Sequence, residues 1–244
     1  MQDKKPDHHW NESIIMEINQ NMNHSPMQDS DRWKRARQTM LAKHLQPRGI
    51  IDRRVLDAMS RVPREEFVLP DQQSFAYNDC ALPIGCKQTI SQPFTVAYMC
   101  QAAQLTGDEK VLEVGTGSGY GAAVLSLLAS EVHTVERIPE LKKQAAQRLH
   151  HLGYSNVHVH TADGTLGVQE AAPYDAIIVT AGAASLPEPY LNQLKSNGRI
   201  IIPIGTEHTG QTMYRFILKN GELSEENLGA FTFVPLIGEY GWPQ

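Results

Sequence analysis

Three features that would place this chain in other classes of protein are missing from its sequence. The three cysteines, Cys80, Cys86 and Cys100, are an odd number without a Cys-x-x-Cys pair, which argues against a disulfide framework or a zinc–thiolate site. No stretch approaches the roughly 20 apolar residues that span a bilayer, and Ile14–Ile18 is too short an apolar core for a signal peptide. No basic block stands out in a chain of net charge −5. We therefore expect a cytoplasmic protein with free thiols that binds neither nucleic acid nor membranes.

The 244 residues, 41% of them hydrophobic, are enough for one sizeable core and predict a single domain, which we expect to be monomeric. Residues 1–30 differ from the rest, because they are rich in Asn, Gln, Asp, His and Met and show little periodicity. They indicate a poorly ordered extension, with a short helix over residues 12–19 as an alternative. The domain is expected over 31–244, with a helical and loop region (31–105), an α/β core (106–205) and C-terminal strands (206–244).

Residues 31–69 are expected to form two helices. Apolar side chains from Trp33 to Leu45 recur at helical spacing, and the Pro47-Arg-Gly49 segment would end the first helix. Asp52 can cap a second helix, which should stop before Pro63.

From residue 106 onward, apolar strand-like segments alternate with helical segments. The expected strands are Lys110–Val114, Val132–Glu136, Val157–Thr161, Asp175–Thr180 and Gly198–Ile202, and the expected helices are Tyr120–Leu128, Pro139–Leu152 and Pro187–Leu194. This alternation predicts an α/β fold, a doubly wound and mostly parallel sheet with helices on both faces. Gln211–Lys219 and Leu228–Ile237 indicate a hairpin around Asn220-Gly221, so we expect an antiparallel C-terminal edge.

Four glycines, at positions 115, 117, 119 and 121, follow the first of these strands and open a helix. Glycine lets the backbone turn tightly and a ligand approach closely, and the helix N-terminus offers free N–H groups. Gly117, Gly119 and Ala122 also satisfy the pattern of dinucleotide-binding enzymes, so the glycines alone do not identify the ligand. Glu136, which ends the second strand, stands where either cofactor class has its ribose-binding acid.

Two acidic residues favour S-adenosylmethionine over a dinucleotide. Glu113 lies in the strand just before the glycines, and an acid there suits a ligand that carries an ammonium and a sulfonium group. Asp163, which precedes Gly164 after the third strand, could accept a hydrogen bond from an adenine amino group, although a plain Asp-Gly turn would also explain the pair. The sequence thus predicts a methyl donor at the carboxyl ends of the strands.

Four segments together resemble the protein-L-isoaspartate (D-aspartate) O-methyltransferase family over about residues 31–240. They are Arg48-Gly-Ile50 through Val62-Pro-Arg-Glu-Glu-Phe67, Ala81-Leu-Pro-Ile-Gly85 with Gln88-Thr-Ile-Ser-Gln-Pro93, Val111-Leu-Glu-Val-Gly-Thr-Gly-Ser-Gly-Tyr120, and Phe233-Val-Pro-Leu236. The third segment is shared by many methyltransferases, whereas the second is more specific to this family. The resemblance implies methyl transfer from S-adenosylmethionine, which becomes S-adenosylhomocysteine, to the free α-carboxylate of L-isoaspartyl residues in damaged proteins and peptides. The ester would then close to a succinimide, which initiates repair.

The resemblance also implies roles for individual residues. Ser91 corresponds to the family's catalytic serine and would hold the substrate, while Val234 and Pro235 would cover the active site. The residues expected to bind the donor are Gln88, Thr89, Ile90, Glu113, Gly115, Thr116, Gly117, Ser118, Gly119, Glu136, Arg137, Asp163, Gly164 and Thr180. Taken alone, Ser91 would be interpreted as a serine that caps the helix beginning near Pro93.

The chemistry of a carboxylate substrate explains why no catalytic triad or metal cluster stands out. A carboxylate is ionised near neutral pH and needs no general base to attack an activated methyl group, so orientation is the main requirement. His158 and His160 share a face of the third strand, but no carboxylate or cysteine nearby in sequence completes a ligand set, so no metal is expected. Two other functions stay open. One is a nicotinamide dehydrogenase, against which the Gln88–Pro93 segment argues, and the other is a non-catalytic module that recruits isoaspartyl-containing proteins.

Overall fold

The computed structural model describes residues 26–206 and 210–243. The alternative helix over residues 12–19 and most of the expected N-terminal extension lie outside the described residues. The chain divides between Ala36 and Arg37 into two compact units. In the first unit the described residues belong to helix α2, Pro26–Met40, which begins inside the segment that we expected to be poorly ordered.

In the second unit, the residues after α2 continue in helical turns and then change direction. The turns are a π-type turn over Leu41–Leu45 and a 3-10 turn over Gln46–Arg48. Gly49 follows with a left-handed backbone of φ 90°. Helix α3, Arg53–Arg61, begins after Asp52, whose Oδ1 accepts a 2.8 Å hydrogen bond from the backbone N–H of Arg54. It ends before Pro63, so both ends of α3 lie where the sequence predicts them.

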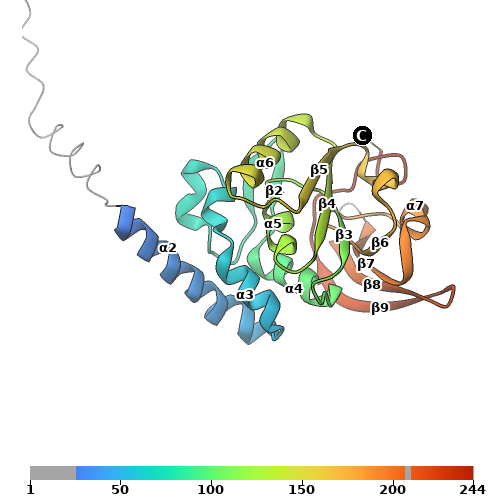
Figure 1. The fold of residues 1–244 in the computed structure, drawn as a ribbon, viewed down its shortest axis with the longest axis horizontal. Coiled ribbons are helices and arrows are strands. Elements are labelled where there is room, and N and C mark those ends of the chain that lie inside the picture. The colour runs from blue at the N-terminus through green and yellow to red at the C-terminus, as the bar shows by residue number, and fades with distance from the viewer. Residues whose placement is uncertain (1–25, 207–209, 244) are drawn as a thin grey trace, which may run out of the picture. The chain divides into compact units, whose positions relative to one another are not determined.

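Among the described residues, a seven-stranded sheet forms the centre of the second unit, with the strand order β5-β4-β3-β6-β7-β8-β9 (Figure 1). Its strands are β3 (Lys110–Val114), β4 (Glu131–Glu136), β5 (Val157–Thr161), β6 (Tyr174–Val179), β7 (Leu194–Thr206), β8 (Gly210–Lys219) and β9 (Glu222–Phe231). Strands β3 to β7 run parallel, and β8 and β9 pair antiparallel at one edge. A separate two-stranded sheet pairs β1 (Leu82–Gly85) with β2 (Gln88–Ile90).

Helices cover both faces of the large sheet, which confirms the predicted doubly wound fold. Helices α4 (Pro93–Ala103), α5 (Tyr120–Ser126) and α6 (Pro139–His151) lie on one face, and α7 (Glu188–Asn192) lies on the other (Figure 1). The 3-10 turns η3 (Arg64–Phe67), η4 (Pro70–Phe75), η5 (Gly164–Leu166) and η6 (Gln169–Ala171) lie in the connections. No helix among the described residues is long and apolar enough to cross a membrane.

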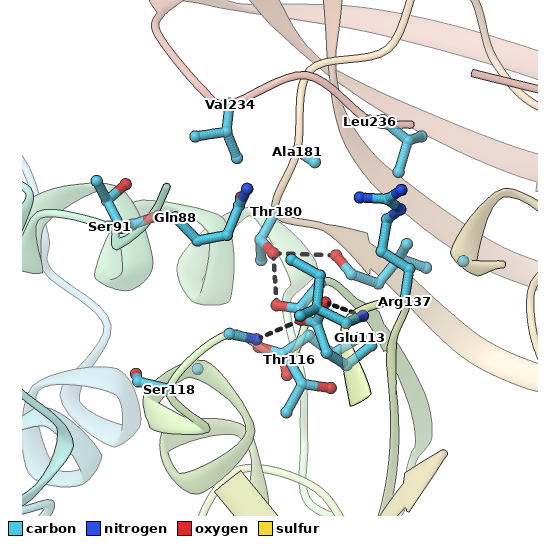
Figure 2. A pocket seen from close by; sticks show the side chains of 18 of the residues that line it. Gln88, Ser91, Glu113, Thr116, Ser118, Arg137, Thr180, Ala181, Val234 and Leu236 are labelled. Atoms are coloured by element: carbon cyan, nitrogen blue, oxygen red, sulfur yellow. Dashed lines mark hydrogen bonds between the residues drawn. The ribbon is translucent and has the colours of Figure 1, made fainter. Parts of the chain in front are cut away.

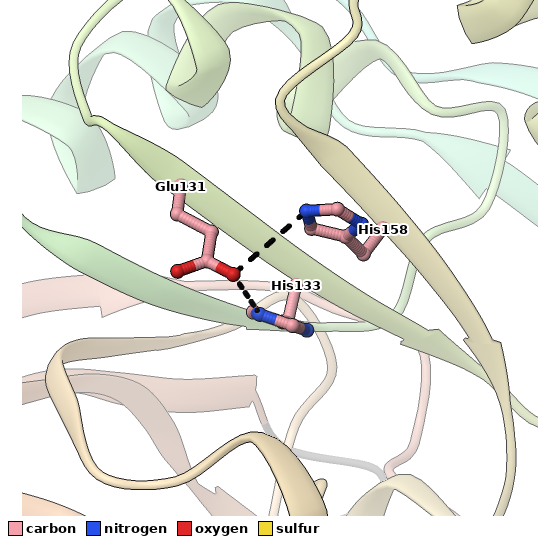
Figure 3. A group of neighbouring side chains, drawn as sticks. All are labelled: Glu131, His133 and His158. Atoms are coloured by element: carbon pink, nitrogen blue, oxygen red, sulfur yellow. Dashed lines mark hydrogen bonds and ion pairs between the residues drawn. The ribbon is translucent and has the colours of Figure 1, made fainter.

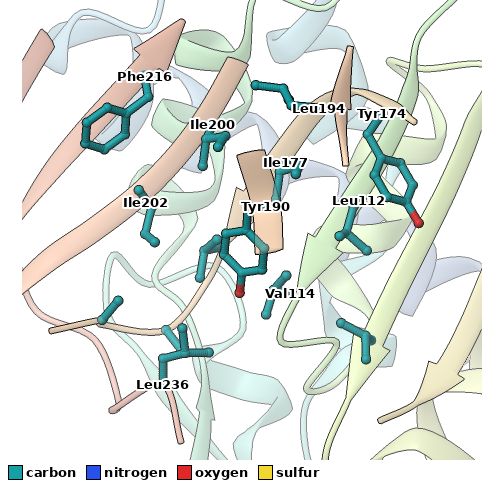
Figure 4. Close-up of a cluster of buried hydrophobic side chains, with 14 of the residues drawn as sticks. Leu112, Val114, Tyr174, Ile177, Tyr190, Leu194, Ile200, Ile202, Phe216 and Leu236 are labelled. Atoms are coloured by element: carbon teal, nitrogen blue, oxygen red, sulfur yellow. The ribbon is translucent and has the colours of Figure 1, made fainter. Parts of the chain in front are cut away.

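The face that α7 covers carries a cluster of buried hydrophobic side chains (Figure 4). Parallel strands that are covered on both faces are apolar throughout, which is why β3, β6 and β7 contribute the fully buried Leu112, Ile177 and Ile200. Tyr174 and Tyr190 complete the core, and each donates its hydroxyl to a backbone carbonyl, at 2.7 and 2.9 Å. Close packing on this face fixes the strand ends relative to one another and gives the carboxyl edge of the sheet a rigid base.

The C-terminal hairpin differs from the expectation in its second strand. The turn at Asn220-Gly221 lies where the sequence predicts it, but β9 spans Glu222–Phe231 instead of Leu228–Ile237. The apolar pattern misses the start of this strand because all of residues 222–227 except Leu223 are polar, and they lie exposed on the outermost strand. The pattern also misplaces the end of β9. After Phe231 the chain stops pairing with β8 and passes to the end of β6, where Pro235 pairs with Gly182. Strand β7 is also longer than the predicted Gly198–Ile202. Its first residue, Leu194, pairs with Tyr174 of β6, and its antiparallel pairing with β8 continues to Thr206.

Candidate active site

The carboxyl ends of the parallel strands border a pocket, as expected for a ligand of a doubly wound sheet (Figure 2). Its walls come from β2 and the residue after it, the turn between β3 and α5, the ends of β4 and β6, and residues 234–237. Of the expected site residues, the pocket brings together Gln88, Thr89, Ile90, Ser91, Glu113, Gly115, Thr116, Gly117, Ser118, Glu136, Arg137, Gly164, Thr180, Val234 and Pro235. Residues distant in the sequence thus meet in one cavity.

The glycine-rich turn is held between β4 and β6. The N–H of Gly115 donates to the carbonyl oxygen of Val135 in β4 at 2.9 Å. The hydroxyl of Thr180, just after β6, donates to the carbonyl oxygens of Val114 at 3.0 Å and Gly115 at 2.9 Å. Gly115 has φ 101°, and a Cβ atom there would collide with the Thr180 hydroxyl. Only glycine fits both the backbone and the space at this position.

Glu136, at the end of β4, presents a carboxylate to the turn. Its Oε2 accepts a hydrogen bond from the N–H of Gly117 at 2.9 Å, and its Oε1 accepts one from the N–H of Ile138 at 3.0 Å. These bonds hold the side chain, which is buried, in one orientation, while each oxygen keeps a lone pair for a further donor. Such a carboxylate can accept hydrogen bonds from the hydroxyls of a ribose.

Glu113, in β3 just before the turn, is a second acid and is only 1% exposed. Its Oε2 accepts a hydrogen bond from the Thr134 hydroxyl at 2.6 Å, and that hydroxyl also contacts the hydroxyl of Thr116 at 2.7 Å. Burial raises the pKa of Glu113 to about 8, the hydrogen bond from Thr134 opposes this rise, and the negative charge of Glu136 adds to it. A cation beside Glu113 would lower this pKa again, so the pocket suits a positively charged ligand.

Gly121, in the first turn of α5, makes room for this acid. A Cβ atom at position 121 would collide with Oε1 of Glu113. The sequence suggests that the glycines admit a ligand, but at position 121 the structure assigns the space to a side chain of the protein itself.

Ser91 lies between β2 and α4, on the same side of the pocket as Gln88 (Figure 2). Within the described residues no hydrogen bond occupies its hydroxyl. Helix α4 is capped at Gln92 without a side-chain hydrogen bond, so Ser91 is not a capping serine. Its backbone carbonyl accepts a 2.7 Å hydrogen bond from Nη2 of Arg64. The backbone is thus fixed while the hydroxyl is available to a substrate.

Arg64 is a fully buried cation that the sequence does not single out, although it lies in a segment that carries the family resemblance. Its Nε donates to the carbonyl oxygen of Ala76 at 2.7 Å, and its guanidinium carbon lies 4.6 Å from the centre of the Tyr120 ring, which lines the pocket. Burial lowers the pKa of Arg64, and the interaction with Tyr120 opposes that shift. Arg64 therefore ties the Ser91 segment to the start of α5.

The C-terminal segment forms the remaining wall of the pocket. The N–H of Gly182, after β6, donates to the carbonyl oxygen of Val234, and the N–H of Leu236 donates to the carbonyl oxygen of Gly182, both at 2.8 Å. Pro235, between them, forms an isolated bridge with Gly182. This pairing places Val234 and Pro235 in the lining of the pocket, and their role as a cover over the active site stays a prediction.

Two expected donor-binding residues lie outside the lining of this pocket. Gly119 packs against α6, where a Cβ atom would lie 3.2 Å from a methyl carbon of Leu149. The Asp163 carboxylate caps η5, because its Oδ1 accepts from the N–H of Thr165 at 2.9 Å. Its Oδ2 accepts from the N–H of Glu239 in the C-terminal segment at 2.8 Å. Asp163 lines a separate hollow beside the pocket, and its contact with an adenine amino group stays a prediction.

The lining residues that are not among the expected site residues are mostly apolar. They are Val96, Val114, Tyr120, Gly121, Val135, Ile138, Ala181, Leu236 and Ile237. An apolar residue at a strand end looks the same in sequence whether it faces a core or a cavity. Only Ile138 could have been expected from the sequence, because it follows the predicted ribose-binding acid Glu136 by two residues. In the structure its backbone N–H donates to that carboxylate.

Known proteins of similar sequence and fold point to one family. Residues 35–241 match the family model described as protein-L-isoaspartate(D-aspartate) O-methyltransferase (PCMT). The chain is 51% identical over 214 residues to a protein-L-isoaspartate O-methyltransferase of Dictyoglomus turgidum, covering 88% of this chain and 96% of the relative. It is 52% identical to protein-L-isoaspartate O-methyltransferase 1 of Geotalea uraniireducens, covering 84% of this chain and 94% of the relative.

Among solved structures, two share the fold over most of this chain. A protein-L-isoaspartate O-methyltransferase matches with a TM-score of 0.76 at 32% identity, over 84% of this chain and 67% of that chain. A second structure, from Plasmodium falciparum, matches with a TM-score of 0.71 at 25% identity, over 84% of this chain and 98% of that chain. It is described as a candidate protein-L-isoaspartate O-methyltransferase in complex with S-adenosyl-L-homocysteine.

Proposed function

The chain belongs to the protein-L-isoaspartate(D-aspartate) O-methyltransferase family, and we propose that the pocket at the carboxyl edge of its sheet is the active site. The protein is an S-adenosylmethionine-dependent methyltransferase that acts on isoaspartyl-containing proteins. It transfers a methyl group to the free α-carboxylate of an L-isoaspartyl residue. The ester then closes to a succinimide, which reopens partly to normal aspartate, and this initiates repair.

The pair of acids Glu113 and Glu136 is the observation that carries the assignment of the pocket. S-Adenosylmethionine has a ribose for Glu136 and a cationic methionyl part whose charge Glu113 would stabilise. A dinucleotide would instead bring an anionic pyrophosphate to the turn. The carboxylate of Glu136 would repel it, and the N–H of Gly117 is already donated to Glu136. The same contacts therefore disfavour a nicotinamide dehydrogenase.

Ser91 is the residue that we assign to the substrate. When bound, S-adenosylmethionine supplies a methyl group that its positive sulfur has already activated. One oxygen of the isoaspartyl carboxylate forms the new C–O bond while the C–S bond breaks and sulfur keeps the electron pair, so no proton is transferred. The Ser91 hydroxyl donates to the other oxygen and orients the carboxylate, and such orientation can account for most of the acceleration. A hydroxyl suits this task because a full positive charge would stabilise the ground-state carboxylate and make it less reactive.

The cover over the site is the second contribution of the chain to the reaction. Val234 and Pro235 are fixed to the end of β6 through Gly182 and place apolar surface over the pocket. We assign them to excluding water and to holding the substrate backbone against Ser91.

We further propose that the protein acts as a monomer in the cytoplasm and binds neither nucleic acid nor membranes. Cys80 and Cys86 are exposed free thiols, which suit a reducing compartment. The net charge of −5 disfavours polyanionic partners.

The decisive experiment compares two peptides that differ only in carrying aspartate or isoaspartate at one position. The protein is incubated with methyl-labelled S-adenosylmethionine, and base-labile label is measured in each peptide. We expect label in the isoaspartyl peptide alone. Donor binding without any label would contradict the reaction and favour a non-catalytic module, and label in both peptides would contradict the assigned substrate.

A further inference from the structure

A cluster of histidines and one glutamate lies on the sheet away from the active site (Figure 3). Glu131 and His133 point to the same face of β4, because they are two residues apart. His158 in β5 is the direct cross-strand partner of His133. The sequence offers His158 no third ligand nearby, but the parallel pairing of β4 and β5 brings a carboxylate and a second imidazole beside it.

We propose that Glu131, His133 and His158 form a binding site for a divalent metal ion of the Zn²⁺ type. Oε1 of Glu131 lies 2.9 Å from Nε2 of His133 and 3.8 Å from Nε2 of His158. One ligand atom from each of the three lies within 4.8 Å of the other two. A tetrahedral ion with bonds of about 2.0–2.2 Å holds its ligand atoms roughly 3.3–3.6 Å apart. The three atoms therefore need to move by only a few tenths of an ångström to about one ångström.

A further histidine, His160, contacts the ring nitrogen of His133 that does not face Glu131. Nδ1 of His133 lies 2.9 Å from Nε2 of His160. An ion on Nε2 of His133 requires the proton on Nδ1, which then donates to His160. The remaining proton of His160 sits on Nδ1, which faces Oε1 of Glu170 at 3.8 Å. A ligating histidine that donates its other N–H to a partner is the usual arrangement at metal sites.

One cation lies beside the cluster. Lys110 competes for the carboxylate, since its Nζ lies 3.4 Å from Oε2 of Glu131, but Oε1 is the oxygen that faces the histidines.

The position of the cluster indicates what the ion would do. Glu131 begins β4, whereas Glu136 of the active site ends it. Strand β5 is an edge strand of the sheet, and an ion shared by Glu131, His133 and His158 would crosslink it to β4. Because the ion lies away from the pocket, it would stabilise the edge of the sheet and leave the rate of methyl transfer unchanged.

The test is titration of the full chain with ZnCl₂ in a calorimeter near pH 7.5, on the wild type and on matched variants. His158 is half-exposed, so His158→Ala should fold normally, and Glu131→Gln keeps the size of the side chain while removing its charge. We expect one site in the wild type that is weakened at least tenfold by each substitution. Zn²⁺ should also raise the melting temperature of the wild type and not that of His158→Ala.

Two control variants separate this cluster from the other histidines of the chain. His151→Ala removes an exposed histidine of α6, and the double variant His8→Ala/His9→Ala removes an adjacent pair. Both should bind Zn²⁺ as the wild type does. Failure of the wild type to bind, equal binding by His158→Ala, or loss of binding in either control variant would overturn the proposal. Since the wild type and His158→Ala should methylate the isoaspartyl peptide at equal rates, failure here is distinct from failure of the proposed function.

Discussion

At the scale of single residues, the active site rests on two acids in different surroundings. Glu136 accepts hydrogen bonds from two backbone N–H groups, whereas Glu113 accepts one from a hydroxyl and is almost completely buried. The difference makes Glu113 the acid that responds to charge, because a buried carboxyl group without a cation keeps its proton to higher pH.

The raised pKa of Glu113 makes stability depend on pH. The ordinary pKa of the group is 4.5, and burial raises it to about 8 in the fold. Between these values the unfolded chain has lost a proton that the fold retains, so raising the pH favours unfolding. Urea denaturation should show the free energy of unfolding falling by a few kcal/mol between about pH 5 and pH 8. Glu113→Gln should flatten this slope and Glu140→Gln, an exposed acid, should not. An unchanged slope in Glu113→Gln would contradict the assignment.

Truncation of Ser91 and truncation of Glu136 should affect different steps of the reaction. Glu136→Ala removes hydrogen bonds of a charged group to the ribose, worth about 1.5–3 kcal/mol, so the donor should bind roughly ten to a hundred times more weakly. Ser91→Ala loses the orientation of the carboxylate, so kcat should fall by up to about a hundredfold while donor binding stays unchanged. Donor titration and single-turnover kinetics distinguish the two effects. Wild-type behaviour of both variants would show that the site is assigned wrongly.

At the scale of elements, the first turn of α5 is built around the Glu113 side chain. Alanine in place of glycine within a helix usually stabilises it by about 1 kcal/mol. Gly121→Ala should instead destabilise the protein and weaken donor binding, because the new methyl group would collide with Oε1 of Glu113. Adding Glu113→Ala should restore part of the lost stability, which a double-mutant cycle in urea measures. A single variant more stable than the wild type would refute this account.

Arg64 links η3, the β2–α4 connection and α5 through one buried guanidinium. Lysine cannot donate to the carbonyls of Ala76 and Ser91 together and stack on Tyr120. Arg64→Lys should therefore cost about 3 kcal/mol or more of unfolding free energy. Because Arg64 holds the backbone of Ser91, kcat should also fall more than donor affinity. Arg61→Lys, at an exposed ion pair, should stay within about 0.5 kcal/mol of the wild type. Equal losses in kcat and donor affinity would mean that Arg64 is only a structural residue.

Prediction from sequence works for elements whose burial is uniform. Strands β3 and β6 are mostly apolar because both faces are covered, and the pattern places each of them to within a residue at either end. It places β4 and β5 equally well, although β5 is a half-exposed edge strand. Strand β9 is only half predicted, because one edge faces solvent and most of its first six residues are polar. The buried Arg64 and the pairing of His133 with His158 depend on which segments the fold brings together. Local periodicity does not contain that information.

At the scale of the whole molecule, one pocket collects segments that span residues 88 to 237. A ligand in it contacts the β2–α4 connection, the sheet and the C-terminal segment at once. Each of these parts must be in its native position for the ligand to bind. Ligand binding should therefore raise the free energy of unfolding of the second unit as a whole and not only stabilise one loop.

S-Adenosylhomocysteine should raise the melting temperature of the protein through this linkage. A ligand at a hundred times its Kd contributes about 2.7 kcal/mol, and each kcal/mol shifts the melting temperature of a chain this size by about 2–4 °C, so the shift should be roughly 5–10 °C. Differential scanning calorimetry should show it in the wild type and in Ser91→Ala, which keeps the donor site. Glu136→Ala should lose most of it at the same ligand concentration. His158→Ala should keep it in full, because the histidine cluster and the pocket lie at opposite ends of β4. A shift that His158→Ala abolished would show that the edge of the sheet and the donor site are coupled.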